Sequence, residues 1–148
     1  MKHAPVVIRL YPTEIQKADL IEALKIDRHD LDRELLKQPA KYVWWATLYA
    51  EVSRKVDSVE EKMDRLEAKL AVRYVKELRE RKTRYKVSDV KYYIANDHKY
   101  QKLQTQLRRW KASERILKAA ERGFTQRAAM LQSYCANTRR ERKATEND

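Results

Sequence analysis

The sequence predicts an all-α protein, a long antiparallel helical hairpin with short N-terminal helices that self-associates into a homo-oligomer. Glycine occurs once and proline three times in 148 residues, whereas a multi-stranded sheet needs a turn about every 8–12 residues. Apolar residues also recur at helical spacing over two long stretches. We therefore expect a single helical domain over residues 1–136, followed by a disordered polar tail over residues 137–148.

The N-terminal segment is expected to contain an irregular arm and two short helices. In the arm, residues 1–12, Val6-Val7-Ile8 either pair as a short strand or simply pack. The short helices span residues 13–37. The first begins at Thr13, which follows a proline and forms a capping box with Gln16. The second runs over residues 27–37.

A long helix is predicted over residues 39–82. Pro39 suits its first turn, and no glycine or proline follows it within that range. Apolar residues alternate at spacings of three and four, which is typical of a coiled-coil seam. This seam, which serves either the hairpin or the oligomer, begins near Tyr42 and consists of Trp45, Tyr49, Val52, Val56, Val59, Met63, Leu66 and Leu70. Arg73 follows in register, so the helix is expected to leave its partner near Leu70. Trp44 lies outside the register, and either packs on the N-terminal helices or contacts another subunit.

A second long helix is predicted over residues 89–135, antiparallel to the first. Ser88 or Asp89 can cap its start, and Asn96-Asp97 and Gly123 are the points where it can be interrupted. Its buried stripe is predicted to comprise Ile94, Leu103, Leu107, Trp110, Leu117, Ala120, Phe124, Ala128 and Leu131.

The net charge of +12 is segregated along the chain. Residues 1–70 hold 13 basic and 13 acidic side chains, whereas residues 71–148 hold 21 and 9. A segregated excess creates a local positive field, and this field favours nucleic acid as the partner over a plain solvated surface, a membrane or an acidic protein. No apolar run is long enough for a membrane span, and the single cysteine fits a reducing cytoplasm.

The residues that enzymes and metal sites need are missing from the pattern. A single glycine excludes a phosphate-cradling loop. His3, His29 and His98 lie far apart, with no cysteine or carboxylate at ligand spacing, so we expect no metal site. Cys135 has no histidine near it on the same predicted face. We therefore expect no catalytic residue, no cofactor and no enzymatic activity.

The candidate nucleic-acid-binding residues cluster just beyond the seam. Basic side chains can follow a phosphate backbone, and flat rings can stack on unpaired bases, which together are the requirements of non-specific single-strand binding. The alternative is a solvated basic face. Tyr85 and Tyr92 are the better stacking candidates, whereas Tyr74, Tyr93 and Tyr100 fall on buried stripes. The predicted site consists of Arg73, Lys76, Arg79, Arg81, Lys82, Arg84, Tyr85, Lys86 and Lys91. A second patch, which extends this path or merely keeps the oligomer soluble, comprises Lys102, Arg108, Arg109, Lys111, Arg115 and Lys118.

Several short motifs resemble the UvsY-type family of phage recombination mediators. Residues 63–68, Met-Asp-Arg-Leu-Glu-Ala, are similar to a stretch on the long helix of that family, and Tyr49 matches an aromatic position there. The Arg-Gly-Phe of residues 122–124 is similar to one near the end of its last helix, and Ile26-Asp27 with Leu31 resembles its N-terminal segment, with a length difference. The resemblance covers residues 15–132. One departure concerns the basic pair of the family, which would align near Val75 and Glu77, whereas here the charges are Arg73 and Lys76.

This resemblance implies a small, helical, ring-forming homo-oligomer. Such proteins bind single-stranded DNA and help to load a RecA-like recombinase onto DNA covered by single-strand-binding protein. The resemblance therefore implies three partners, namely single-stranded DNA, the recombinase and the single-strand-binding protein, and a place in the host cytoplasm if the protein is encoded by a phage. The alternative function is a helical scaffold or assembly adaptor with no nucleic-acid role.

Overall fold

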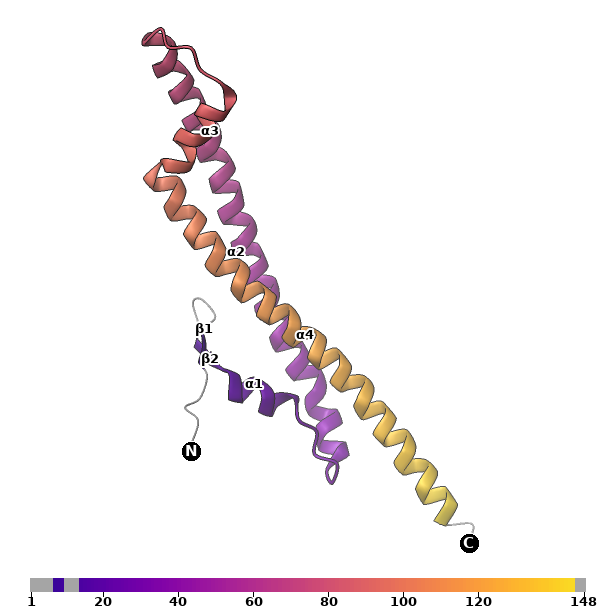
Figure 1. The fold of residues 1–148 in the computed structure, drawn as a ribbon. Coiled ribbons are helices and arrows are strands. Elements are labelled where there is room, and N and C mark those ends of the chain that lie inside the picture. Colours follow the sequence, from indigo (N-terminus) through magenta and orange to yellow (C-terminus); the bar gives the residue numbers. More distant parts are fainter. Residues whose placement is uncertain (1–6, 10–13, 146–148) are drawn as a thin grey trace. The chain divides into compact units, whose positions relative to one another are not determined.

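The part of the protein that the structure describes is mainly helical, with one short β-ribbon near its N-terminal end (Figure 1). A computed structural model describes residues 7–9 and 14–145. Its elements are β1 (Val7–Arg9), β2 (Glu14–Gln16), α1 (Lys17–Leu24), α2 (Leu31–Glu80), α3 (Val87–Asn96) and α4 (His98–Thr145). The chain divides into two compact units: unit 1 combines residues 1–51 with 113–148, and unit 2 is residues 52–112. Both long helices contribute to each unit.

The N-terminal ribbon replaces the start of the predicted first helix. β1 pairs antiparallel with β2, with Ile8 opposite Ile15, so the strand alternative holds for residues 7–9, while Val6 lies outside the described residues. The prediction of a helix from Thr13 was wrong at residues 14–16, because these residues pair as a strand and α1 begins at Lys17. Thr13 itself lies outside the described residues.

Helix α2 is one continuous helix, so the predicted break between residues 37 and 39 was wrong. Asp30 starts the helix, because its carboxylate accepts a hydrogen bond from the Arg33 amide at 3.3 Å. Pro39 lies inside the helix, where a proline removes one backbone hydrogen bond and costs about 3 kcal/mol. Beside it, the side-chain amide of Gln38 donates a hydrogen bond from Nε2 to the Phe124 backbone carbonyl of α4 at 2.8 Å. Packing against α4 thus offsets a local preference that favours a break.

The core of unit 1 is a narrow apolar strip between α2 and α4. Phe124, Leu117 and Leu131 are fully buried, as the predicted stripe on the second long helix requires. The Trp45 ring stacks on the Phe124 ring with centroids 5.7 Å apart. Trp44 makes an edge contact with Trp45 at 4.7 Å but remains 55% exposed. Its indole is therefore mostly available at the surface rather than packed on the N-terminal helix.

Arg127 is the polar centre of unit 1. Its side chain is 2% exposed and forms a salt bridge with Glu34 and a hydrogen bond with the Gln38 side-chain oxygen. It also donates to the Lys25 carbonyl from Nη2, at 3.0 Å. A buried charge is tolerated only when it is paired and hydrogen-bonded. Arg127 therefore ties the segment before α2 and the first turns of α2 to α4.

Gly123, the single glycine, lies where the Leu24 side chain closely approaches α4, and it does not interrupt that helix. A Cβ built at this position would lie 3.2 Å from Leu24 Cδ2 and 3.4 Å from Cδ1. A hydrogen at this point of α4 therefore gives the Leu24 side chain room to pack on the helix backbone. This contact positions the end of α1 within unit 1.

Unit 2 is held by the heptad seam. Val52, Val56, Val59, Met63 and Leu70 are buried and Leu66 is half-buried, so these seam residues pack inside the chain. The salt bridge from Lys111 to Glu60, at 2.5 Å, and the hydrogen bond from the Tyr100 hydroxyl to Glu67, at 3.5 Å, show that α2 and α4 run antiparallel here.

The expectation that α2 leaves its partner near Leu70 was wrong. Leu70 and Leu78 form one buried cluster with Val90 and Ile94 of α3. The short helix α3 thus becomes the partner of α2 once the heptad register ends at Arg73. This happens because Tyr74 and Leu78 continue an apolar stripe at a spacing of four after the strict heptads stop.

The second predicted helix is two helices, and its end lies further along the chain than expected. As anticipated at Asn96-Asp97, α3 ends at Asn96, and the Asp97 carboxylate then accepts hydrogen bonds from the amides of Lys99 and Tyr100 at the start of α4. The predicted disordered tail was wrong for residues 137–145, which continue α4 to Thr145. These residues include several good helix formers and no glycine or proline, and cations favour the C-terminal end of a helix.

None of the helices in the described part of the chain combines the length and the apolar character that a membrane crossing requires.

The Arg127 network predicts a large loss of stability on truncation. Arg127→Ala leaves the Glu34 carboxylate and the Lys25 carbonyl without their partner, so we expect a loss of about 3–5 kcal/mol in the free energy of unfolding. Arg115→Ala, which removes an exposed arginine from the same helix, should change stability by less than about 0.5 kcal/mol. Urea denaturation followed by circular dichroism measures both. Equal midpoints for the two variants would contradict this role of Arg127.

The Gly123 contact predicts coupling between this residue and Leu24. Alanine gains about 1 kcal/mol of helix propensity over glycine, but its Cβ meets the Leu24 methyl groups. Gly123→Ala should therefore stabilise the protein more when Leu24 has been replaced by alanine than when it is present. Thermal melts of the two single variants and the double variant test this, and an identical effect of Gly123→Ala in both backgrounds would show that the contact is not tight.

Candidate nucleic-acid interface

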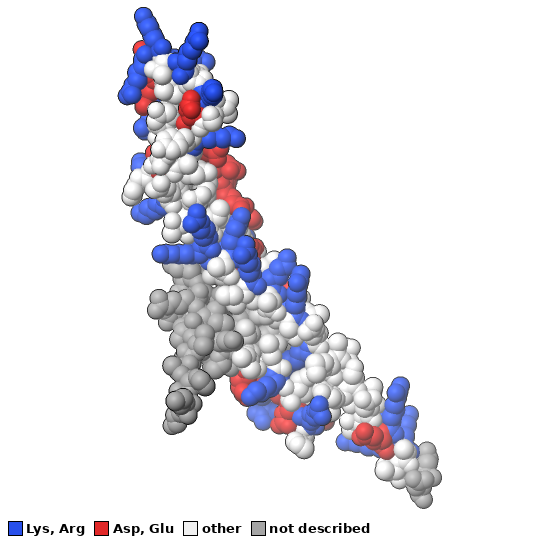
Figure 2. Space-filling view, viewed as in Figure 1, with Lys and Arg blue, Asp and Glu red and all other residues white. Residues whose placement is uncertain are grey.

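The predicted cations lie together in unit 2, around the turn between α2 and α3. Figure 2 shows lysine and arginine side chains gathered where α2 ends. Arg73, Lys76 and Arg79 come from the last turns of α2. The connection over residues 81–86 supplies Arg81, Lys82, Arg84 and Lys86, and Lys91 lies in the middle of α3. All eight are exposed: Arg73, Lys76, Arg79, Arg81, Lys82, Arg84, Lys86 and Lys91. We call them, with Tyr92 and Tyr93, the basic tip.

The turn has a defined backbone geometry. The Lys82 amide donates to the Arg79 carbonyl at 3.0 Å and the Thr83 amide to the Leu78 carbonyl at 3.1 Å. These two bonds form a Schellman motif, in which the residue after the helix adopts a left-handed conformation and is usually glycine. Here it is Lys82, with φ of 52°. A lysine in this conformation costs about 1–2 kcal/mol, so the turn presents a cation where the backbone alone would favour glycine.

Entry to α3 is fixed by Asp89. Its carboxylate accepts a hydrogen bond from the Lys86 amide at 2.7 Å. Asp89 therefore caps α3, as the sequence analysis allowed. It does so as the third residue of the helix, because α3 begins at Val87. Since Val90 and Ile94 hold the other face of α3 in the apolar cluster, the outer face of α3 has a defined direction.

The basic tip contains two classes of cation. Arg73 forms a salt bridge with Glu77 at 3.0 Å, and Lys76 one with Glu80 at 3.9 Å. These pairs are solvent-exposed and contribute little to stability, so a phosphate can compete for them. Among the residues that the structure describes, no salt bridge involves the other six: Arg79, Arg81, Lys82, Arg84, Lys86 and Lys91.

The tyrosines divide differently from the prediction. Tyr85 packs half-buried against the cluster of Leu70, Leu78, Val90 and Ile94, so its ring is not open for stacking. Tyr92 is 68% exposed, as expected. Tyr93 was expected in the core but is 40% exposed.

The rings of Tyr74, Tyr93 and Tyr92 and the Arg73 guanidinium form a row of contacts, which we call the tyrosine stack. The Arg73 guanidinium lies 5.2 Å from the Tyr74 ring centroid, and the Tyr74 and Tyr93 rings stack at 5.2 Å with an interplanar angle of 26°. Tyr92 then meets Tyr93 edge-on at 6.2 Å. The spacing of Val90 and Ile94 could have identified the buried face of α3, because Tyr92 falls opposite that pair and Tyr93 at its border. The exposed Tyr92 ring at the end of this row offers a flat face on which an unpaired base can stack.

The second basic patch is divided between the two units. Lys102, Arg108, Arg109 and Lys111 belong to unit 2, whereas Arg115 and Lys118 belong to unit 1. Lys111 is also engaged with Glu60. The structure therefore gives no support for a continuous path through these residues.

The remaining sequence predictions concern the seam residues, the histidines and Cys135. The seam side chains from Trp45 to Leu70 are buried or half-buried inside the chain, so they act as a hairpin seam. Over the described ranges, no three His, Cys, Asp or Glu side chains are grouped so that they could hold a metal ion. His29 and His98 are exposed, His3 lies outside the described residues, and Cys135 is a half-buried free thiol.

Comparison with known proteins identifies the family. Residues 19–137 match the family model described as "Recombination, repair and ssDNA binding protein UvsY". This span includes the motifs at residues 63–68 and 122–124 and the whole basic tip. Searches of the curated proteins and of the solved structures found no match. Because the family model covers most of the sequence, the chain belongs to the UvsY family of recombination, repair and single-stranded-DNA-binding proteins.

Proposed function

We propose that this protein binds single-stranded DNA through the basic tip of unit 2. The observation that carries the proposal is the combination, within one compact unit, of two exposed tyrosines, Tyr92 and Tyr93, with six cations that form no salt bridge among the described residues. Cations neutralise backbone phosphates, and each neutralised phosphate releases counterions. Lys82 supports the same function, since a strained lysine at the apex of the turn has no structural benefit over glycine.

The tyrosine stack favours single strands over duplex. In a duplex the flat faces of the bases are already stacked on each other, so a surface tyrosine gains nothing from them. In a single strand every base offers a free face, whatever its identity. We therefore expect little sequence preference and a marked preference for single-stranded DNA.

The finer role we propose is that of a recombination mediator. Membership of the UvsY family supports it. In this role the protein acts without catalysis and without a cofactor, and it helps to load a RecA-like recombinase onto DNA covered by single-strand-binding protein. The recombinase and the single-strand-binding protein are proposed partners, and the cytoplasm of an infected host is the proposed location.

We also propose that the protein works as a homo-oligomer, in the form of a ring. The heptad seam does not supply the contact, because it is used inside the chain. Unit 1 leaves large apolar side chains at its surface, among them Leu36, which is 82% exposed, Val43, 59%, and Trp44, 55%. Apolar surface of this kind is typical of protein–protein contacts. Trp44 is accordingly a subunit contact in this proposal.

A helical scaffold without a nucleic-acid role would share the oligomer but not the DNA binding. Retention on heparin and the ratio of absorbance at 260 and 280 nm of the purified protein separate the two functions. A scaffold elutes early and carries no nucleic acid.

Neutralising the turn should weaken DNA binding and reduce its salt dependence. Removal of four phosphate contacts by Arg79→Ala, Arg81→Ala, Lys82→Ala and Arg84→Ala should lower the slope of log K against log salt by about 3, at ~0.7 per contact on a single strand. Fluorescence anisotropy of a labelled thirty-residue oligothymidine (dT30), measured over a salt series, gives the slope.

The matched control for this variant removes the same charge elsewhere in unit 2. Arg54, Lys55, Lys62 and Lys69 are exposed on α2, away from the turn. Their replacement by alanine changes the net charge equally and should leave most of the slope intact. If the two variants lose affinity and slope to the same extent, the binding reflects net charge and the basic tip is not the site.

Tyr92 should contribute through its ring and not through its hydroxyl. Tyr92→Ala should weaken dT30 binding by about 5- to 150-fold, which corresponds to ~1–3 kcal/mol for one stacked base. Tyr92→Phe keeps the ring and should bind as the parent does. Since Tyr92 is mostly exposed, neither change should affect the melting temperature. Parental affinity in Tyr92→Ala would exclude stacking on this ring.

A further inference from the structure

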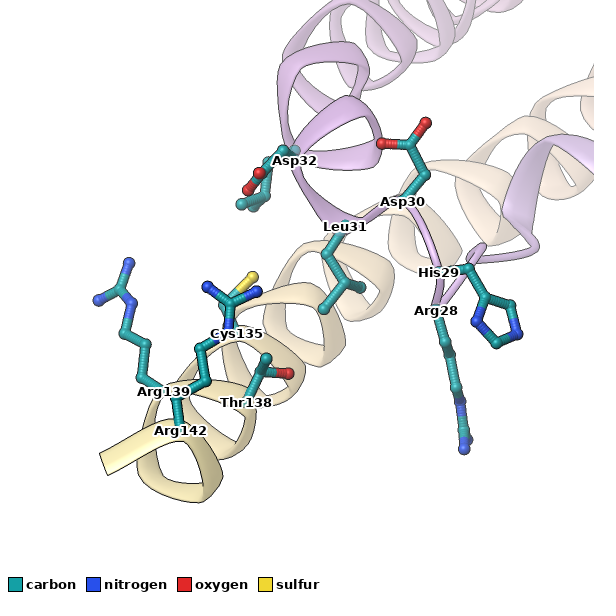
Figure 3. Close-up of a pocket in the computed structure, with 10 residues that line it drawn as sticks. Arg28, His29, Asp30, Leu31, Asp32, Cys135, Thr138, Arg139 and Arg142 are labelled. Carbon is teal, nitrogen blue, oxygen red and sulfur yellow. The ribbon is translucent and has the colours of Figure 1, made fainter. Parts of the chain in front are cut away.

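Unit 1 contains a small pocket lined by cations from two parts of the chain. It has a volume of about 240 Å³ and lies between the start of α2 and the last turns of α4 (Figure 3). Arg28 precedes α2, whereas Arg139 and Arg142 come from α4. In Figure 3, Arg139 and Arg142 stand on one side of Leu31 and Arg28 on the other. The three arginines thus flank the pocket from opposite sides.

The position of Arg28 is fixed by Tyr134. Its Nη2 donates to the Tyr134 hydroxyl at 2.8 Å, and its guanidinium lies 4.7 Å from the Tyr134 ring centroid. A guanidinium has five N–H donors, so most of its donors stay available after this bond. Arg28 therefore has a fixed position at the edge of the pocket, although Tyr134 itself does not line this pocket.

Two acidic side chains, Asp30 and Asp32, also line the pocket and reduce its positive charge without cancelling the three arginines. Asp30 accepts a hydrogen bond from the Arg33 amide as the cap of α2. In the described part of the chain, no salt bridge involves Arg28, Arg139 or Arg142. Guanidinium groups bind phosphate through paired N–H donors more readily than ammonium groups do, and Thr138 at the same pocket can contribute a hydroxyl.

Stabilisation of the helix end does not account for all of these residues. Cations in the last turns of α4 favour the C-terminal end of the helix dipole, but Arg28 lies on another segment and lines the same pocket. The volume also limits the ligand, because pockets for drug-sized molecules measure about 300–1,000 Å³. A single phosphate group suits the size better than a nucleotide base.

We propose that this pocket binds one backbone phosphate of single-stranded nucleic acid, as a second contact separate from the basic tip. The inference rests on the proposed DNA binding and extends it to unit 1. The family match ends at residue 137, so it includes neither Arg139 nor Arg142. Two contacts on one chain raise the effective concentration of the strand at each of them.

The experiment uses Cys135, the single cysteine of the chain, which lines the pocket. The full-length protein is alkylated with iodoacetamide, with and without dT30. Occupation of the pocket should slow alkylation about tenfold when free dT30 is at ten times its Kd, because only the unoccupied site reacts. Anisotropy on the same samples reports dT30 binding independently. A second arm replaces dT30 with inorganic phosphate.

The matched variants separate the pocket from its surroundings. Arg139→Ala with Arg142→Ala should abolish the protection and, through loss of the one phosphate contact, lower the salt slope by about 0.7. Arg140→Ala with Lys143→Ala removes the same charge from the same helix end, at residues that do not line this pocket, and should keep the protection. Folding of both variants is checked by circular dichroism, since all four side chains are exposed.

The outcomes distinguish a failure of the pocket assignment from a failure of the proposed function. If dT30 binds the parent but leaves Cys135 as reactive as before, the pocket assignment is wrong and the basic tip still stands. If both double variants lose protection equally, the effect is diffuse charge and the pocket is again excluded. Protection by phosphate but not by dT30 identifies a site for a small anion and overturns the nucleic-acid contact. If dT30 does not bind the parent at all, the proposed function fails and the pocket proposal with it.

Discussion

The antiparallel contact between α2 and α4 is the constraint on which both units depend. Two paired helices can bury only one stripe each, so the core is a narrow strip in which every buried position matters. Phe124, Leu117 and Leu131 are fully buried on α4, and the buried apolar residues of α2 recur at heptad spacing. Much of the remaining surface of both helices is exposed. This surface can carry charge without cost to the core.

The heptad pattern predicted this contact because burial on a paired helix has a fixed period. The same local reasoning failed at Pro39 and at the tail. A proline predicts a break from its own geometry, but the side chains of Gln38 and Arg127, far apart in sequence, hold α2 together across it. The burial of Arg127 could not be predicted from the sequence, because an arginine within a basic helix is normally a surface residue. Tertiary hydrogen bonds of this kind leave no periodic trace in a sequence.

The cations of the basic tip could be predicted, but the rings beside them could not be assigned correctly. Charge density is a property of the sequence, and eight exposed cations follow from it. The exposure of a tyrosine depends instead on which face of α3 packs on α2. Once Val90 and Ile94 define that face, Tyr93 moves from the expected core to the surface. Tyr85, which was expected to stack on a base, turns inward and helps to cover the cluster.

The tyrosine stack is thus coupled to the packing of a very short helix. Within α3, only Val90 and Ile94 are buried, so two aliphatic side chains determine where Tyr92 and Tyr93 point. In the proposed mode of binding, the cations of the turn reach phosphates through long flexible side chains and tolerate small shifts of the backbone. Stacked rings do not, because their contact depends on ring orientation and distance. Under this proposal, loosening α3 would remove base stacking while most of the electrostatic attraction persisted, so the apolar cluster of Leu70, Leu78, Val90 and Ile94 would determine how well the surface discriminates single strands from duplex.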